Sequence, residues 1–174
     1  MICDRWGVSD SEAARRYPCD EFVREPVLQA WRGVRVAAPP EAVWPWVGQV
    51  RLAPYSYDWI DNRGRRSPRE LAGLPEPRVG ERFTTAGGQA LGRIVSVDPG
   101  QQLTGTIMGA FMSYVLVPRE REMTRLRLKV VMQTTRWVAD DPGLVTHDDP
   151  AARVGVLLNA ARSMTELVDR KSVV

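Results

Sequence analysis

The chain has 174 residues, of which 44% are hydrophobic and 26% charged, so it is long enough for one domain with its own core and ordinary in composition for a soluble globular protein. Its net charge of +3 comes from arginine, because Lys129 and Lys171 are the only lysines. The arginines alternate with acids or scatter over predicted strands, which argues against the basic stripe of a nucleic-acid-binding protein.

The first residues, M-I-C-D-R-W-G, lack the basic and apolar runs of a secretory signal. The uncharged stretch 99–118 has about the length of a membrane helix, on the order of 20 residues. Its glutamines, glycines and strand-forming residues instead favour two strands and a turn. We therefore expect a cytoplasmic protein without a membrane span.

Cys3 and Cys19 are the only cysteines, and both lie far from the single histidine, His147. Because a zinc site usually needs about four Cys and His ligands at characteristic spacing, we expect no metal site. Two free thiols in a reducing cytosol are the simpler interpretation. His147 lies between acidic turn residues, which favours an exposed loop histidine over a catalytic one.

Residues 1–30 are predicted to form a lead-in segment with one short helix. Ser9 and Glu12 have the spacing of a capping box, which predicts a helix over about residues 10–16. This helix would end before Pro18, since the residue that precedes a proline avoids the helical conformation.

The stretch 31–60 opens the main domain. Val34 and Val36 alternate with polar residues, which predicts a strand over 31–37. Pro40 suits the first position of a helix. The apolar residues after it recur at helical spacing on one face: Val43, Trp46, Val47 and Val50. Pro45 lies inside this helix, so either the helix bends there or a regular helix begins later. Ser56 and Gly64 would begin and end a second short helix.

Residues 63–79 are rich in arginine and proline, and we interpret them as a long surface loop, either a lid or merely mobile. Five strands are predicted after this loop, over 81–86, 91–97, 103–108, 111–117 and 123–135. Strands this close in sequence must pair antiparallel. In the last strand, one face carries Leu126, Leu128, Val130 and Met132, and the other carries Arg125, Arg127, Lys129 and Val131.

Asp149 and Pro150 predict the start of a long final helix. Apolar residues keep a helical spacing in it from Val154 to Val168. Such a stripe is best buried against the concave face of the sheet.

The order of strand, two short helices, antiparallel strands and long helix is that of the helix-grip fold. The stretch V-R-V-A-A-P-P-E-A-V-W-P-W-V, followed by Y-S-Y-D-W-I-D-N, closely resembles the SRPBCC superfamily, which contains START-like, plant-allergen-like and polyketide cyclase/dehydrase-like proteins. Trp6-Gly7 and P-C-D-E at 18–21 also look like bacterial members of unknown function. The resemblance covers roughly residues 6–135, and its most specific part is A-P-P-E-A-V-W-P-W.

This resemblance implies an α+β helix-grip domain over residues 31–174, in which a curved antiparallel sheet wraps round the long C-terminal helix. It also implies a hydrophobic cavity between sheet and helix, able to hold lipids, polyketides, steroids or similar ligands. The superfamily shares no universal catalytic residues, so the fold alone does not imply an activity.

The densest cluster of polar-tipped groups is Tyr55, Tyr57, Asp58, Trp59 and Asp61. A buried Asp58 beside two phenols would have a raised pKa and act as an acid or base, with Tyr57 or Tyr55 as its partner. Alternatively, the acids lie near the N-terminus of a short helix, where its dipole favours them. Tyr55, Tyr57 and Trp59 are also candidates for lining a pocket.

The other candidate ligand-binding residues are soft or aromatic sheet residues and two polar residues of the final helix: Met108, Met112, Tyr114, Met132, Trp137, Asn159 and Ser163. Methionine adapts to irregular cavities, although such residues also form ordinary cores. Asn159 and Ser163 would orient a ligand only if they faced inward.

The chain contains no nucleophile elbow, no nucleotide-binding glycine motif and no H-E-x-x-H, so we expect no cofactor. Three functions remain open. The first is binding of a small hydrophobic molecule in the internal cavity. The second is a cyclase- or dehydratase-type enzyme that uses Asp58 with Tyr55 or Tyr57. The third is a non-catalytic interaction module that docks a partner through the 63–79 loop. The sequence leaves the ligand, the occurrence of a reaction and the oligomeric state undecided.

Overall fold

The computed structural model describes residues 5–53, 55, 63–86, 88–120 and 122–133. Its elements are β1 Arg5–Trp6, α1 Asp10–Ala13, η1 Pro18–Glu21, β2 Leu28–Val36, α2 Pro40–Gly48, η2 Gln49–Arg51, β3 Arg82–Ala86, β4 Gln89–Asp98, β5 Gln102–Ile107, β6 Ala110–Arg119 and β7 Met123–Met132. Both η elements are 3-10 helices. The predicted C-terminal helix lies outside the described residues.

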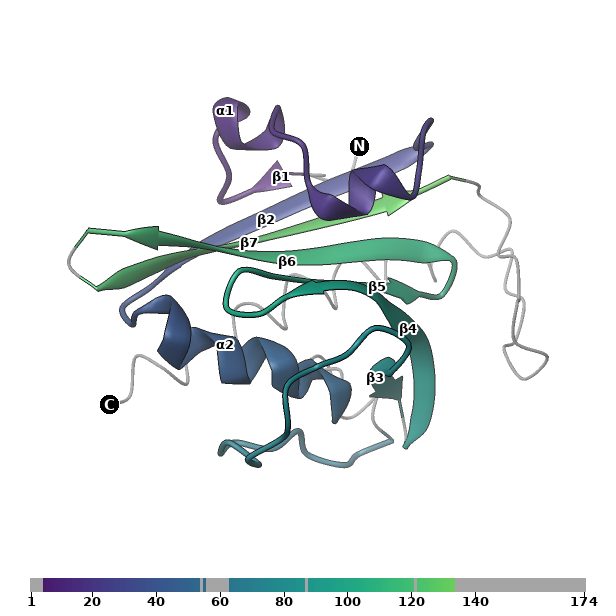
Figure 1. The fold of residues 1–174 in the computed structure, drawn as a ribbon. Coiled ribbons are helices and arrows are strands. Elements are labelled where there is room, and N and C mark those ends of the chain that lie inside the picture. The colour runs from purple at the N-terminus through teal and green to yellow at the C-terminus, as the bar shows by residue number, and fades with distance from the viewer. Residues whose placement is uncertain (1–4, 54, 56–62, 87, 121, 134–174) are drawn as a thin grey trace.

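The strands form one seven-stranded sheet in the order β1-β2-β7-β6-β5-β4-β3 (Figure 1). The five strands predicted after residue 80 are confirmed as β3 to β7, and each pairs antiparallel with its neighbour in the sheet. The sheet is nevertheless mixed, because the two-residue β1, which the sequence did not predict, adds to β2 in parallel at the edge. Strand β2 begins at Leu28, earlier than the predicted Trp31.

The turn between β5 and β6 corrects one predicted boundary. Met108 and Gly109 both have positive φ, 48° and 79°, and join the paired residues Ile107 and Ala110. Two central residues with positive φ are typical of a tight type I′ hairpin, whose twist matches the flanking strands. Met108 therefore lies in the turn and not at the end of the strand.

The sheet is sharply curved at its β3 end. Phe83 of β3 packs onto Gly105 of β5, across the intervening β4, and a Cβ at Gly105 would lie 2.1 Å from the Phe83 ring. The pairing register of β4 with β5 also shifts between Ile94 and Ser96. Such a bulge bends the strand that carries it. Together these features make one face of the sheet concave.

We call this concave face, which carries Leu126 and Leu128, the inner face. Helix α2 packs against it and begins at Pro40 as predicted. The helix continues through Pro45, which is exposed, so it does not begin later in the chain. Its predicted apolar residues, Val43, Trp46, Val47 and Val50, are all buried.

The opposite, outer face is covered by residues 5–23, which we call the N-terminal segment (Figure 1). Helix α1 has the predicted capping box between Ser9 and Glu12, but it ends at Ala13. From this segment Tyr17, Cys19 and Val23 pack with Trp31 and Val131 into a second buried cluster. The lead-in therefore supplies part of the core.

The N-terminal segment also pairs with charges of β7. Lys129 is buried, with its Nζ 2.6 Å from Asp20 Oδ1 and 5.5 and 5.0 Å from the ring centroids of Tyr17 and Trp31. Arg125 is held in the same way by Glu12. A buried cation is tolerated when it has such partners. No helix among the described residues is long and apolar enough to cross a membrane.

Candidate functional site

The inner face is the candidate ligand surface, and its side chains are matched across the strands. Tyr114 lies opposite Leu103 on β5 and opposite Leu128 on β7, and Met112 lies opposite Val130. Directly opposite residues of antiparallel strands share a face. These rows belong to one cluster of buried hydrophobic residues that extends along the sequence from Ala30 to Met132. The result is a continuous apolar surface across four strands.

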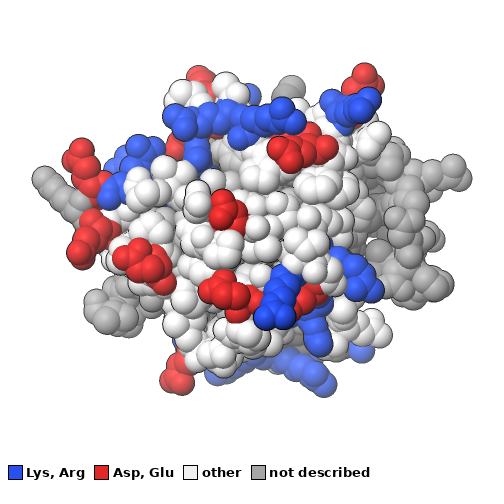
Figure 2. Space-filling view, viewed as in Figure 1, with Lys and Arg blue, Asp and Glu red and all other residues white. Residues whose placement is uncertain are grey.

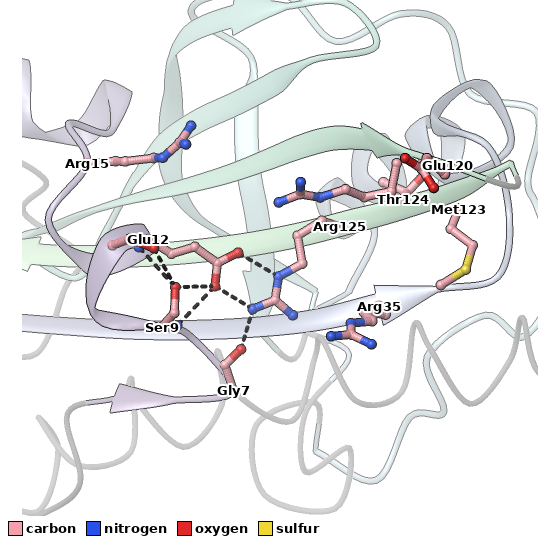
Figure 3. A pocket seen from close by; sticks show the side chains of 11 residues that line it. Gly7, Ser9, Glu12, Arg15, Arg35, Glu120, Met123, Thr124 and Arg125 are labelled. Atoms are coloured by element: carbon pink, nitrogen blue, oxygen red, sulfur yellow. Dashed lines mark hydrogen bonds and ion pairs between the residues drawn. The ribbon is translucent and has the colours of Figure 1, made fainter.

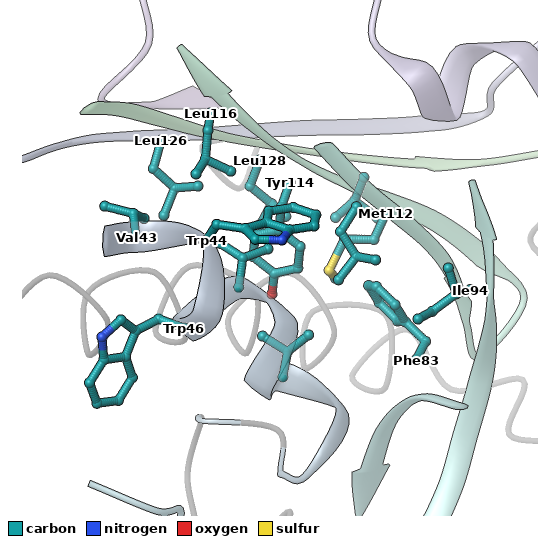
Figure 4. Packing of buried hydrophobic residues seen from close by; sticks show 14 of the residues in the cluster. Val43, Trp44, Trp46, Phe83, Ile94, Met112, Tyr114, Leu116, Leu126 and Leu128 are labelled. Carbon is teal, nitrogen blue, oxygen red and sulfur yellow. The ribbon is translucent and has the colours of Figure 1, made fainter. Parts of the chain in front are cut away.

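Three of the candidate residues lie on this surface. Met112, Tyr114 and Met132 are each 3% exposed and belong to the inner cluster. Figure 4 shows Met112 and Tyr114 between Trp44 of α2 and the Phe83–Ile94 end of the sheet. The Tyr114 and Phe83 rings are tilted by 43° with their centroids 6.3 Å apart. The remaining candidate methionine, Met108, is half-buried in the β5–β6 turn, away from these rows.

Tyr55 is the one member of the aromatic-acidic cluster that the structure describes. It is fully buried, and its hydroxyl accepts a hydrogen bond of 2.5 Å from Gln49 Nε2. The same amide donates to the Glu70 carbonyl at 2.9 Å, and its Oε1 accepts from the Ala72 N–H at 2.8 Å. A primary amide with both N–H groups and its oxygen engaged is held in one orientation. Gln49 thus orients the Tyr55 phenol.

The 63–79 loop is tied to α2 and η2 at several further points. The buried Arg51 guanidinium contacts Glu81 Oε2 and donates to the carbonyls of Gly48 and Pro75. Trp44 Nε1 donates to Glu76 Oε2 at 2.9 Å. The loop contains no helix or strand, as predicted, but these contacts fix its position beside the inner face. Its proposed role in docking a partner stays a prediction.

Sequence reasoning missed Gln49 and Arg51. Both are polar residues that flank the apolar Val50, and both bond to backbone groups more than twenty positions away. The only local signal is a polar side chain where the helical spacing predicts the edge of an apolar face. That signal identifies no partner.

The other site candidates lie outside the described residues: Tyr57, Asp58, Trp59, Trp137, Asn159 and Ser163. Their assigned roles therefore stay predictions. Within the described part of the chain, no group of His, Cys, Asp and Glu residues is arranged to hold a metal ion. Cys19 is free and buried, and its burial raises the pKa of the thiol to about 11.

No family model and no curated protein matches the chain. Among solved structures, one from Mesorhizobium loti is 16% identical with a TM-score of 0.50, over 84% of this chain and 98% of that one. A Rhodobacter sphaeroides protein is 22% identical, with a TM-score of 0.49 over 86% of this chain and 92% of that one. An AHSA1-like protein from Rhizobium etli is 16% identical, with a TM-score of 0.49 over 83% and 81%. At these identities the comparison shows a similar fold and no more, which is consistent with the predicted resemblance to the SRPBCC superfamily.

Proposed function

We propose that the protein binds a small hydrophobic molecule, a lipid, a polyketide or a similar compound, between the inner face and the predicted C-terminal helix. The observation that carries the proposal is the curved apolar surface of β4 to β7, on which Met112, Tyr114 and Met132 lie together. A concave, mostly apolar surface with few polar groups is the usual lining of a small-molecule site.

The dimensions of the elements support a space for a ligand. Helix α2 has nine residues and spans about 14 Å. Strands β6 and β7 have ten residues each and span about 33 Å. Helix α2 is therefore too short to cover the inner face, and the remaining length is where we expect the final helix and the ligand. Methionine side chains at that place would adapt to ligands of different shape.

The proposal is tested by thermal melting of the full chain with a panel of fatty acids, sterols and aromatic polyketides. We expect a bound apolar ligand to raise the melting temperature by several degrees at a concentration of about 100 times Kd. Met112→Trp should abolish that shift by filling the space. Phe111→Trp is the matched control, because Phe111 is the neighbouring residue and packs on the outer face against Phe22.

A protein that binds none of these compounds would contradict the proposal, and so would equal shifts in both tryptophan variants. If Met112→Trp does not fold, Met112→Leu provides the second test. Its smaller change of shape should alter the order of preference among ligands of different chain length while the protein remains folded.

A second candidate function is catalysis of the cyclase or dehydratase type by Asp58 with Tyr55 or Tyr57. The observation that favours it is the buried Tyr55 phenol, oriented by Gln49 at 2.5 Å. A fixed phenol is a suitable proton donor or acceptor for a neighbouring substrate. Asp58→Asn should abolish turnover of a polyketide substrate without lowering the melting temperature. Unchanged turnover in Asp58→Asn would exclude this role.

A further inference from the structure

A pocket of about 800 Å³ lies on the outer face, between α1 and the hairpin that joins β6 to β7 (Figure 3). This volume is within the range of small-molecule sites, about 300–1,000 Å³. The pocket is separated by the sheet from the inner face and its apolar rows. A molecule bound in this pocket would therefore not reach the inner face.

The lining of this pocket carries an excess of positive charge. Its charged residues are the four arginines Arg15, Arg35, Arg119 and Arg125 and the two glutamates Glu12 and Glu120, so the lining has a net charge of +2. Figure 2 shows basic side chains gathered along the upper edge, over α1, and basic and acidic side chains together at the left end, where β6 and β7 turn. A concave surface lined by one sign of charge concentrates the field and attracts the opposite charge.

Glu12 neutralises only one of the four arginines. Its two carboxylate oxygens accept hydrogen bonds of 2.8 Å from Arg125 Nε and Nη2, and a further bond runs from Arg125 to the Gly7 carbonyl. These bonds lower the pKa of the Glu12 carboxyl to about 2, so it remains ionised and paired. Figure 3 shows this pair between Arg15 and Arg35.

The other three arginines are unpaired within the described part of the chain. No hydrogen bond or ion pair among those residues engages the side chains of Arg15, Arg35 and Arg119. Arg35 also lies directly opposite Arg125 in the β2–β7 ladder. Like charges at opposite positions are unfavourable, and Glu12 bonds to Arg125 and not to Arg35.

The remaining cations of the outer face make a useful contrast. The N-terminal segment covers Lys129 and Arg127: Lys129 pairs with Asp20, and both cations lie over the Tyr17 ring. Arg15, Arg35 and Arg119, which line the pocket, have no such partner among the described residues. A guanidinium has a planar fork of donors that matches the oxygens of phosphate and carboxylate groups.

We propose that this pocket binds a small molecule with several anionic oxygens, a phosphate ester or a polycarboxylate, through Arg15, Arg35 and Arg119. The Glu12–Arg125 pair forms the floor of the site and holds the N-terminal segment against β7. The Met123 side chain, which also lines the pocket, provides an apolar contact for the carbon part of such a ligand.

Isothermal titration calorimetry of the full chain tests the proposal, with pyrophosphate and citrate as separate probes at the same low ionic strength. The double variant Arg35→Gln/Arg119→Gln should bind the effective probe about a hundredfold more weakly, because each charge-assisted contact contributes about tenfold. The matched control is Arg24→Gln/Arg82→Gln. Both residues are exposed, lie outside the pocket and change the net charge equally. The affinity of this control variant for the probe should change less than about threefold, because distant charges are screened by the solvent.

Binding of pyrophosphate alone identifies a phosphate ester, and binding of citrate alone identifies a polycarboxylate. Failure of both probes to bind, or an equal loss in the two double variants, overturns the proposal. If the first double variant does not fold, Arg15→Gln replaces it, with an expected loss of about tenfold. Met112→Trp should leave probe binding unchanged, so the two sites fail or succeed separately.

Discussion

Strand β7 has two buried faces that are held by different forces. Leu126, Leu128 and Val130 point into the inner cluster of aliphatic, methionine and aromatic side chains. Lys129 and Arg127, on the other face, are buried against the Tyr17 ring, and Lys129 also pairs with the Asp20 carboxylate. Antiparallel sheets commonly leave one face in water. Here the N-terminal segment covers the second face. The alternation of apolar and charged residues therefore shows which side chains share a face of β7, but not whether that face is exposed.

This contrast has an energetic consequence. Burial on the inner face is non-directional and depends on volume and apolar area. Burial on the outer face depends on particular partners, because a cation that loses its carboxylate is left unpaired in a poorly hydrated place. Substitutions on the inner face should therefore lower the free energy of unfolding in proportion to the volume of the cavity they leave. Substitutions on the outer face should lower the free energy of unfolding according to whether they leave a buried charge without its partner.

The largest expected effect is on the inner face. Leu128→Ala should lower the free energy of unfolding by about 3–4 kcal/mol, because Leu128 is 1% exposed and its removal leaves a cavity against Tyr114. Urea denaturation measures this difference at unchanged m-value. A loss below about 1 kcal/mol would show that the inner face is loosely packed at this position.

The next effect concerns the buried pair on the outer face. Lys129→Met should cost about 2–3 kcal/mol, because Asp20 loses a cation 2.6 Å away while remaining largely covered. The double variant Asp20→Asn/Lys129→Met should recover part of this loss, since no buried charge is then left without a partner. A double variant less stable than Lys129→Met would show that the two positions contribute independently of their pairing.

A smaller effect is expected at Glu12, with a defined pH dependence. Glu12→Gln should lower the free energy of unfolding by about 1–2 kcal/mol near neutral pH, because the acceptor of the Arg125 hydrogen bonds is then no longer charged. The pKa of Glu12 falls from 4.5 to about 2 on folding. Its contribution is therefore complete above pH 4.5 and is lost as the pH falls toward 2.

Melting temperatures of both proteins between pH 7 and pH 2 measure this dependence. The difference between the native chain and Glu12→Gln should shrink as the pH approaches 2. Asp10→Asn is the control, because its ion pair with Arg5 is exposed and should contribute little at any pH. A constant difference across the range would refute the assignment of Glu12.

Local sequence patterns predicted the elements that depend on local rules. The Ser9–Glu12 cap, the helix at Pro40 and the alternation in β7 each depend on residues a few positions apart. The burial of the outer face was missed, since charged side chains are normally exposed. Its partners are distant in sequence: Arg125 bonds to Glu12, which is 113 positions away.

The candidate site could be predicted only in part for the same reason. Periodicity placed Met132 on the same face as Leu126 and Leu128, because alternation is a local property, and the structure adds Met112 and Tyr114 to that face. It did not reveal that Gln49 orients Tyr55 or that Arg51 holds the 63–79 loop, since each bond joins segments brought together by the whole fold. The arginine pocket was missed because Arg15, Arg35 and Arg119 come from three separate parts of the chain.

The last prediction concerns the chemical modification of Cys19, which reports on the opening of the outer cluster. The thiol is fully buried and hydrogen-bonds to the Lys129 carbonyl, and burial raises its pKa to about 11. In a Cys3→Ser variant, iodoacetamide at pH 8 should therefore modify Cys19 only when the N-terminal segment opens, because the reactive thiolate is scarce and covered.

Mass spectrometry at increasing urea should show modification that follows unfolding. Lys129→Met should shift the onset to lower urea, whereas Phe111→Trp should leave it nearly unchanged. Rapid modification of Cys19 without urea would mean that the N-terminal segment leaves the sheet in the native protein, and the comparison between the two covered faces of β7 would fail.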